Sequence, residues 1–306
     1  MNMNLIVILG PTASGKTKLA ARLAKDRGGE IISADSRQVY RGLNIGTGKD
    51  YSDYLVEGEI VPHHLIDIID PDYEFSVFDY QERFFACFTE IVARQRLPIL
   101  VGGTGLYLDA VLHAYKMFRV PENHKLRAEL GEENEDTLID RLRELKPALH
   151  NKTDLIDKAR LIRAIEIAEH SPLSEADGGG AGWPSLKPIV FGLRWQRPIL
   201  RERITTRLKE RLAAGMIEEV QQLHATGACS WEKMNYFGLE YRYVSLYLRG
   251  LLDYHSMLQQ LNTKIHQFAK RQETWFRRME RQGVFIHWLE DPSYEKLLQQ
   301  LERLPL

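Results

Sequence analysis

The side chains best suited to chemistry stand near the start of the chain, in "GPTASGKT" at residues 10–17. This segment fits the pattern G-x-x-x-x-G-K-[ST] of a phosphate-binding loop, which follows a buried strand and opens a helix. The apolar run "LIVIL" before the segment and the helical spacing of apolar residues after it provide that context. We therefore predict that the whole segment binds phosphates: Gly10, Pro11, Thr12, Ala13, Ser14, Gly15, Lys16 and Thr17.

Each residue type in this loop has a physical role. Gly10 and Gly15 let the backbone turn tightly, so that its N–H groups point at phosphate oxygens. The helix N-terminus adds partial positive charge, and Lys16 adds a full charge. Thr17 offers its hydroxyl to Mg²⁺, the cofactor that such a loop predicts. Most loops of this kind hold a nucleoside triphosphate, so the loop alone also permits a small-molecule kinase.

Two polar residues follow other apolar runs that read as strands. Asp35 ends the run "EIISA" and could bind Mg²⁺, act as a general base, or cap a turn through an Asx bond. Thr104 follows "LVGG", where a nucleotide hydrolase often carries an acidic residue for Mg²⁺. A threonine there suits an uncharged hydrogen bond to a ligand, or a helix N-cap. Ligands of parallel sheets lie at the carboxyl ends of strands, so we expect both residues near the loop.

Other polar residues lie close to Asp35 in the sequence. Ser36 and Gln38 could add hydrogen bonds to a ligand, and Lys49 could add charge. His63 and His64 are adjacent, and adjacent side chains diverge on an extended chain, so a shared metal ion is not expected.

The composition indicates a globular protein with one large or two medium domains. The chain has 306 residues, a net charge of −1 and 44% hydrophobic residues, so any nucleic-acid partner must meet a local basic patch. Its two cysteines lie far apart in sequence, which favours a reducing compartment such as the cytoplasm. We expect no membrane span, because no apolar run approaches 18 residues, and no signal peptide, because "MNMNLIVILG" has no basic n-region or cleavage site.

Strands and helices alternate in the first and last parts of the chain, which predicts an α/β fold with a parallel sheet. The expected strands after the first are residues 30–35, 97–103, 187–195 and 283–289. The middle segment is polar, charged and helical in period, and reads as an insertion. The expected parts are a core at 1–117, a helical insertion domain at 118–186, and a core completion with basic C-terminal helices at 187–306.

One of these C-terminal helices, "TKIHQFAKRQETWFRRMERQ", is both amphipathic and basic. Its a/d positions predict a core face made of Ile265, Phe268, Gln272, Trp275 and Met279. Basic residues lie off that face, where they either contact RNA or are simply solvated: Lys264, Lys270, Arg271, Arg277, Arg278 and Arg281.

Several motifs occur in an order that is familiar: "GPTASGKT", "SADSRQVYRGLNIGTGK", "PHHLIDI", "FSVFDY", "VGGTGLY", "ARLIRAIE" and "QFAKRQETWFRR". On these motifs the chain resembles bacterial tRNA dimethylallyltransferases, also called tRNA isopentenyltransferases, from about residue 5 to residue 290. It departs from the family at "FGLEYR", where many members carry a G-Y-R run, so the residues near Gly238 that contact tRNA are left open.

The resemblance implies a P-loop NTPase-like core with a helical insertion domain, and a prenyl transfer. Dimethylallyl diphosphate donates its five-carbon group to the exocyclic amine of the adenosine on the 3′ side of the anticodon, and pyrophosphate leaves. Asp35 matches the family's general base and Thr104 its threonine near the reacting centre. Lys16 and Arg207 match residues that neutralise the leaving diphosphate, with Arg203 one turn before Arg207.

By the same resemblance, a second set of residues is expected to contact tRNA: Asp35, Ser36, Arg37, Gln38, Thr104, Arg160, Arg163, Lys270 and Arg271. The implied partners are tRNA and dimethylallyl diphosphate, with no membrane and a monomeric protein. Three alternatives stay open on residues alone: a small-molecule kinase, an adenylate prenyltransferase that acts on free AMP, and a nucleotide-gated RNA-binding protein. The Gly-Gly-Thr strand end and the basic helices favour the tRNA enzyme.

Overall fold

The computed structural model describes residues 3–145, 158–174 and 182–304. The chain divides into two compact units, one made of Met1–His113 with Pro184–Leu306 and the other of Ala114–Trp183. The smaller unit covers nearly the segment that the sequence predicts as a helical insertion, 118–186. The two units are described separately below.

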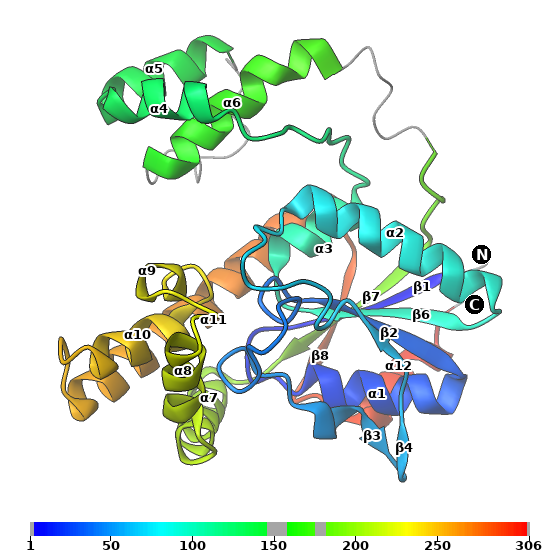
Figure 1. Ribbon diagram of the computed structural model, residues 1–306. Helices are drawn as coiled ribbons and strands as arrows, with labels where there is room; N and C mark the ends of the chain where they lie inside the picture. The colour runs from blue at the N-terminus through cyan, green and yellow to red at the C-terminus, as the bar shows by residue number, and fades with distance from the viewer. Residues whose placement is uncertain (1–2, 146–157, 175–181, 305–306) are drawn as a thin grey trace. The chain divides into compact units, whose positions relative to one another are not determined.

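A six-stranded parallel sheet forms the centre of the larger unit, in the order β5-β2-β6-β1-β7-β8 (Figure 1). The strands are β1 (Leu5–Leu9), β2 (Gly29–Ala34), β5 (His63–His64), β6 (Leu97–Gly102), β7 (Pro188–Arg194) and β8 (Ile286–Glu290). Every residue of β1 and β2 is buried, as expected for strands that are covered on both faces. The predicted α/β fold and its five predicted strands, β1 included, are therefore confirmed.

Helices cover both faces of this sheet (Figure 1). On one face lie α1 (Lys16–Arg27) and α12 (Tyr294–Glu302), and on the other lie α2 (Val77–Ala93) and α3 (Gly105–Leu112). A capping box of Ser76 and Asp79 fixes the start of α2. Beyond β2, a short 3₁₀ turn, η1 (Tyr51–Tyr54), leads into a two-stranded hairpin of β3 (Leu55–Val56) and β4 (Glu59–Ile60).

The remaining helices of the larger unit follow β7 in the chain. They are α7 (Arg197–Ala213), α8 (Met216–Ala225), α9 (Trp231–Met234), α10 (Leu239–Leu248) and α11 (Tyr254–Arg281). The predicted core face of α11 is wrong at one position, because Phe268 is 38% exposed while Ala269 and Phe276 are buried. The strict a/d pattern assumes a repeat of 3.5 residues, whereas a straight helix turns every 3.6 residues, so the buried stripe drifts along a helix of this length.

The smaller unit contains three helices in its described residues, α4 (His124–Glu132), α5 (Glu135–Leu145) and α6 (Lys158–Ser174). They share a core of leucines, with Leu130, Leu138 and Leu142 fully buried. Among the residues that the structure describes, no helix combines the length and the apolar character needed to cross a bilayer.

Candidate active site

The phosphate-binding loop connects β1 to α1 and is shaped by two residues with left-handed backbone. Ala13 has φ of 62° and Gly15 has φ of 85°, and Gly15 is also the N-cap of α1. The left-handed region is favourable for glycine and costly for most other residues, which explains the glycine at position 15. The turn brings Lys16 back over the loop, where its Nζ lies 3.4 Å from the carbonyl oxygen of Pro11.

Side chains from distant parts of the chain hold this loop from outside. Arg203 Nε donates to the carbonyl oxygen of Ala13 at 2.9 Å, and Trp195 Nε1 donates to that of Ser14 at 3.0 Å. The Arg203 guanidinium also stacks on the Trp195 ring, with Cζ 4.6 Å from the ring centroid. Arg203 therefore acts on the loop backbone, a contact that the sequence left open between phosphate binding and a solvated helix face.

A residue of α11, Gln272, also binds the phosphate-binding loop. The backbone N–H of Thr12 donates to Gln272 Oε1 at 2.8 Å, and Gln272 Nε2 donates to the carbonyl oxygen of Gly103 at 2.8 Å. On the other side of the loop, the Arg207 guanidinium donates to the Thr12 hydroxyl. The sequence predicts Gln272 as a core residue, and its burial agrees with that, but its link between two loops was not predicted.

Three cations, Lys16, Arg207 and Arg211, gather beside the loop, and the carboxylates of Asp35, Asp50 and Glu240 lie within electrostatic range of them. Burial, followed by the charge of Arg207, lowers the pKa of Lys16 to about 8. Burial, followed by the charge of Arg211, lowers the pKa of Arg207 to about 10. Arg211 was not predicted, although it lies one helical turn after Arg207; it is buried and pairs with Asp50 at 3.1 Å. The mutual repulsion of these cations suits the cluster to an anionic ligand such as a diphosphate.

The register of the sheet brings Asp35 and Thr104 to the same edge as the loop. Gly102 lies beside Leu9 on one strand and beside Ala34 on the other, so the residues that follow these three positions meet. The Thr104 hydroxyl accepts a hydrogen bond from the backbone N–H of Ser36 at 3.1 Å, which ties the two strand ends together.

Asp35 forms the Asx turn that one interpretation of the sequence predicted, and only one of its two carboxylate oxygens takes part in that turn. Its Oδ1 accepts from the backbone N–H groups of Arg37 at 2.8 Å and Gln38 at 3.3 Å. Its Oδ2 has no hydrogen-bond partner among the residues that the structure describes. Thr104 is likewise the N-cap residue of α3, but its side chain does not cap that helix. Because the hydroxyl accepts from Ser36, its own proton is free to be donated elsewhere.

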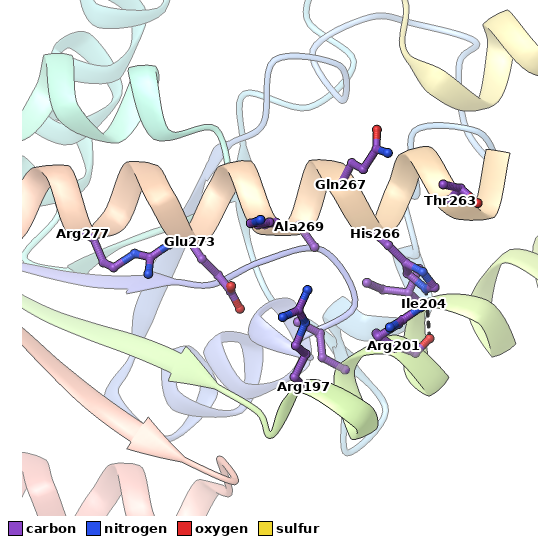
Figure 2. Close-up of a pocket in the computed structure, with 11 residues that line it drawn as sticks. Arg197, Arg201, Ile204, Thr263, His266, Gln267, Ala269, Glu273 and Arg277 are labelled. Atoms are coloured by element: carbon purple, nitrogen blue, oxygen red, sulfur yellow. Dashed lines mark hydrogen bonds between the residues drawn. The ribbon is translucent and has the colours of Figure 1, made fainter. Parts of the chain in front are cut away.

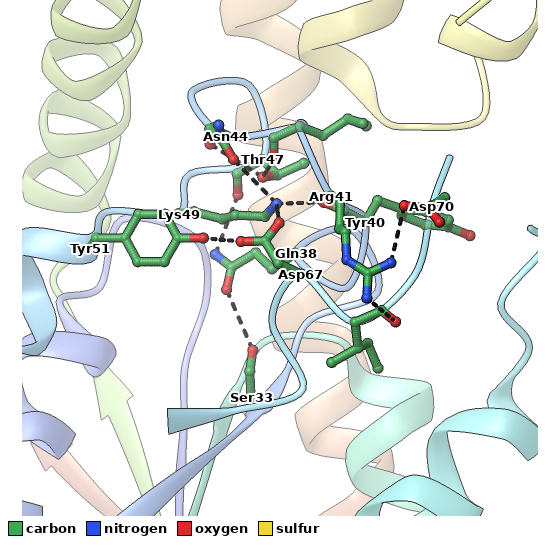
Figure 3. A network of polar contacts seen from close by, with 12 residues as sticks. Ser33, Gln38, Tyr40, Arg41, Asn44, Thr47, Lys49, Tyr51, Asp67 and Asp70 are labelled. Atoms are coloured by element: carbon green, nitrogen blue, oxygen red, sulfur yellow. Dashed lines mark hydrogen bonds and ion pairs between the residues drawn. The ribbon is translucent and has the colours of Figure 1, made fainter. Parts of the chain in front are cut away.

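Two residues of the loop that follows β2 take part in a polar network (Figure 3). Lys49, expected to add charge near a ligand, has a fully buried side chain that pairs with Asp67 and donates to the carbonyl oxygen of Tyr40. Burial lowers the pKa of Lys49, and the hydrogen bond to Asp67 opposes that shift. Gln38 donates to the carbonyl oxygen of Gly48 at 2.8 Å, so its amide shapes the loop. Lys49 is therefore a structural residue, which corrects the expectation.

Glu219 of α8 binds the backbone of the same loop, at residues 44–46. Its carboxylate accepts from the backbone N–H groups of residues 44, 45 and 46, at 3.0, 2.8 and 3.0 Å. The Tyr241 hydroxyl donates to the same carboxylate at 2.7 Å. Tyr241 belongs to "FGLEYR", the segment that departs from the family pattern, and is buried. Nothing in the local sequence signals this contact, since its partners lie more than 170 residues apart.

The neighbouring Glu240 is a further residue that sequence reasoning missed. Burial raises the pKa of its carboxyl, and the charges of Arg211 and Arg207 oppose that shift. The carboxyl therefore lies within electrostatic range of the cation cluster. Gly238, just before it, is the N-cap of α10 with φ of 126°, a conformation that favours glycine.

The basic side chains of α11 lie on two sides of its buried face. Lys270 lines a pocket between α7 and α11, together with other residues drawn in Figure 2: Arg197, Arg201, His266, Glu273 and Arg277. Arg271 lies near the exposed ring of Phe268, with Cζ 5.7 Å from its centroid, and Arg278 lies 5.3 Å from that of Trp275. Phe268 is the exposed ring of the two, and Trp275 is partly buried; an exposed ring beside an arginine suits the stacking of unpaired bases.

The two arginines predicted on the insertion differ in their surroundings within the smaller unit. Arg163 pairs with Glu166 and donates to the carbonyl oxygen of Val120 at 2.8 Å, which gives it a structural role there. Glu166 is 2% exposed and also binds Arg127 at 3.0 Å. Arg160 is exposed on α6. Their proposed contact with tRNA stays a prediction.

A metal ion would find one protein ligand of the expected kind at the loop. Within the described ranges, no three His, Cys, Asp or Glu side chains gather closely enough to hold a metal ion. His63 stacks on Tyr54 at 4.2 Å, and His64 contacts Glu30 at 2.7 Å, so the two histidines point to different partners. Thr17, in the first turn of α1, fits a Mg²⁺ ion that takes most of its ligands from phosphate oxygens and water.

Comparison with known proteins agrees with this geometry. Residues 38–279 match the IPP transferase family, and residues 3–61 match the isopentenyl transferase family. The chain is 57% identical to tRNA dimethylallyltransferase 1 of Syntrophus aciditrophicus over 305 residues, covering 99% of this chain and 98% of the relative. It is 59% identical to tRNA dimethylallyltransferase 2 of Syntrophotalea carbinolica over 292 residues, covering 95% of each chain.

Solved structures support the same assignment. The full-length tRNA isopentenylpyrophosphate transferase of Bacillus halodurans aligns with a TM-score of 0.69 at 34% identity, covering 98% of this chain and 94% of that one. A eukaryotic dimethylallyltransferase acting on tRNA aligns with a TM-score of 0.77 at 24% identity, covering 99% of this chain and 76% of that one, and shows the shared fold. The chain therefore belongs to the tRNA dimethylallyltransferase family of prenyltransferase enzymes.

Proposed function

We propose that this protein transfers the dimethylallyl group of dimethylallyl diphosphate to N6 of the adenosine that follows the anticodon of a tRNA, with release of pyrophosphate. The observation that carries the proposal is the meeting of two half-sites at one edge of the sheet. The cation cluster of Lys16 and Arg207 suits a diphosphate, and the carboxylate of Asp35 lies at the adjoining strand end, beside Thr104.

Asp35 acts as the general base in this reaction. The N6 amine is a poor nucleophile because its lone pair is conjugated with the adenine ring. As N6 forms its bond to the allylic carbon, Oδ2 of Asp35 takes up one amine proton, while Oδ1 stays bonded to the turn. The Thr104 hydroxyl donates a hydrogen bond at the reacting centre and thereby orients the acceptor.

The phosphate loop promotes the departure of pyrophosphate. The bond between the allylic carbon and the diphosphate oxygen breaks with its electron pair on oxygen, so the leaving group gains charge. The Lys16 ammonium, the Arg207 guanidinium and the loop N–H groups stabilise that charge. A Mg²⁺ ion bound at Thr17 would supply further neutralisation of the diphosphate. Arg203 acts indirectly, by fixing the loop backbone at Ala13.

Exposed cations suited to RNA phosphates lie on α11 of the larger unit and, separately, on α6 of the smaller unit. We propose that Lys270, Arg271 and Arg160 contact the phosphates of the anticodon stem-loop, and that Arg37, Ser36 and the adjoining strand end hold the extruded nucleotide. Arg37 lies over the Tyr236 ring, with Cζ 4.6 Å from its centroid, next to Asp35. Because tRNA is the acceptor, we expect the protein to work in the cytoplasm, as a monomer.

One assay tests the proposal against its rivals. The purified protein is incubated with radiolabelled dimethylallyl diphosphate and either an anticodon stem-loop or free AMP, and separately with γ-labelled ATP and either acceptor. We expect label in the stem-loop from the prenyl donor alone. Label transferred chiefly to AMP would support an adenylate prenyltransferase, and phosphoryl transfer from ATP would support a kinase. A stem-loop with guanosine in place of the target adenosine should bind and stay unlabelled.

A further inference from the structure

Gln272 lies where the donor and acceptor halves of the site are joined. It extends from α11 to the edge of the sheet, where its amide bonds to two different loops. One bond reaches the backbone of Thr12 in the phosphate loop and the other the carbonyl oxygen of Gly103, directly before Thr104. Both distances are 2.8 Å, and Gln272 is only 7% exposed.

The chemistry of the two partners specifies an amide at this position. The Thr12 N–H can only donate, and the Gly103 carbonyl oxygen can only accept. An amide side chain offers one acceptor and one donor group, so both partners are satisfied in a single orientation. An ionised glutamate could accept from Thr12 but could not donate to Gly103, and an apolar residue could do neither.

The surroundings leave little freedom for these two loops to adjust. A Cβ atom added to Gly103 would lie 2.4 Å from Gln272 Nε2 and 3.0 Å from the carbonyl oxygen of Gly10. Thr12 is held on its other side by Arg207. A single amide thus occupies the space between the phosphate loop and the Gly-Gly-Thr turn, and fixes how far apart they lie.

We propose that Gln272 is a positioning residue that sets the distance between the donor diphosphate and the acceptor amine. The inference rests on the proposed function, because it concerns the spacing of the two substrates. Gln272 touches neither reacting atom; it acts through the backbone of Thr12 and through Gly103. Displacing a bound reactant by about 1 Å can cost about a hundredfold in rate, which sets the expected size of the effect.

The test compares three variants of the full-length protein. Gln272→Met removes both hydrogen bonds at similar volume, and Gln272→Glu removes the donor. Gln272→Asn keeps an amide in the core but shortens the side chain by one methylene. It replaces the Met variant in the test if that variant does not fold. Gln260→Met, at an exposed position of the same helix away from the pocket that Lys270 lines, is the matched control and should behave as wild type.

The expected result is a separation of rate from binding. In Gln272→Met, kcat for prenylation of an anticodon stem-loop should fall by about ten- to a hundredfold. The Kd values for pyrophosphate and for the stem-loop should change less than threefold. Residue-resolved hydrogen exchange should show faster exchange of the Thr12 amide, which loses its acceptor. Gln272→Glu should also lower kcat and, because it adds negative charge beside the loop, weaken pyrophosphate binding.

Two results would overturn the inference. One is a kcat within threefold of wild type in folded Gln272→Met or Gln272→Asn, and the other is an unchanged exchange rate at Thr12. Loss of thermal stability with normal kcat in the folded fraction would mean that Gln272 is only a core residue. The proposed function is judged separately, on whether the wild-type protein prenylates the stem-loop. If the wild-type protein does not prenylate the stem-loop, the exchange measurement still shows whether Gln272 binds the Thr12 amide.

Discussion

Replacement of Asp35 by asparagine separates the structural role of this residue from its chemical role. Oδ1 of Asp35 accepts from the backbone of Arg37 and Gln38, and the amide oxygen of an asparagine can accept both bonds in the same orientation. The turn and the contact between Ser36 and Thr104 should therefore persist. At the position of Oδ2, however, the variant has an NH₂ group, which cannot take a proton from the acceptor amine.

The expected loss follows from the role of a general base. Removal of such a group costs about 10²- to 10⁴-fold in rate, which corresponds to about 2.7–5.4 kcal/mol in the activation free energy. The assay is single-turnover transfer of the labelled dimethylallyl group from a saturating donor to an anticodon stem-loop. The Kd for pyrophosphate should change less than threefold, since the phosphate loop is untouched. Asp72→Asn, an exposed carboxylate on another loop, is the control.

The size of the rate loss decides the role of Asp35. A single-turnover rate within threefold of wild type would remove Asp35 from the role of base and leave it as a turn residue. A large loss of pyrophosphate affinity would also count against this account, because it would mean that the substitution disturbs the loop.

Three other perturbations probe the rest of the site. Burial lowers the pKa of Lys16 to about 8, so its ammonium loses its proton as pH rises through 8 and diphosphate affinity should fall over that range. Lys16→Arg should abolish that dependence in calorimetric titrations. Thr104→Val should lower kcat/KM for the stem-loop, with a loss of transition-state stabilisation of about 1–3 kcal/mol, because the Ser36 N–H loses its acceptor and the ligand loses its donor. An unchanged kcat/KM would exclude a hydrogen bond from Thr104 to the ligand. Changing Lys270 and Arg271 together to Ala should reduce the slope of log K against log salt for tRNA by about 1.5. An unchanged slope in filter binding would mean that these cations are merely solvated.

The sequence predicted those parts of the candidate site that form one continuous segment or directly follow a strand. The phosphate loop is one continuous segment, and Asp35 and Thr104 each follow a buried strand, so the rule for parallel sheets was enough to place them together. Gln272 and Glu219 could not be predicted in this way, because each bonds to backbone groups more than 160 residues away. Such bonds depend on how α8 and α11 pack, which a local pattern does not specify.

The errors have equally physical causes. Lys49 follows "GTG", a context that suggests a phosphate ligand, but its side chain turns inward to Asp67. Phe268 was assigned to the core by a heptad pattern, although α11 packs as a single helix against several elements. Its exposed ring beside Arg271 instead gives the surface the mixture of aromatic and basic groups that RNA binding requires.

The weakness of the acceptor half explains why the acceptor has to be a large RNA. In the proposed site, Asp35 and Thr104 would offer an adenine two hydrogen bonds, each contributing only about 0.5–1.5 kcal/mol net, or about 1.5–3 where the carboxylate is charged. Association costs about 4–15 kcal/mol in lost freedom, so these contacts alone cannot hold a nucleotide. The difference must come from groups far from the reacting amine, and the cations of α11 are suited to supply it through phosphate contacts. Binding energy from these remote contacts then keeps the amine against Asp35. Free AMP carries one phosphate and cannot make most of these contacts. The kcat/KM for prenylation of AMP should therefore be far below that for the stem-loop.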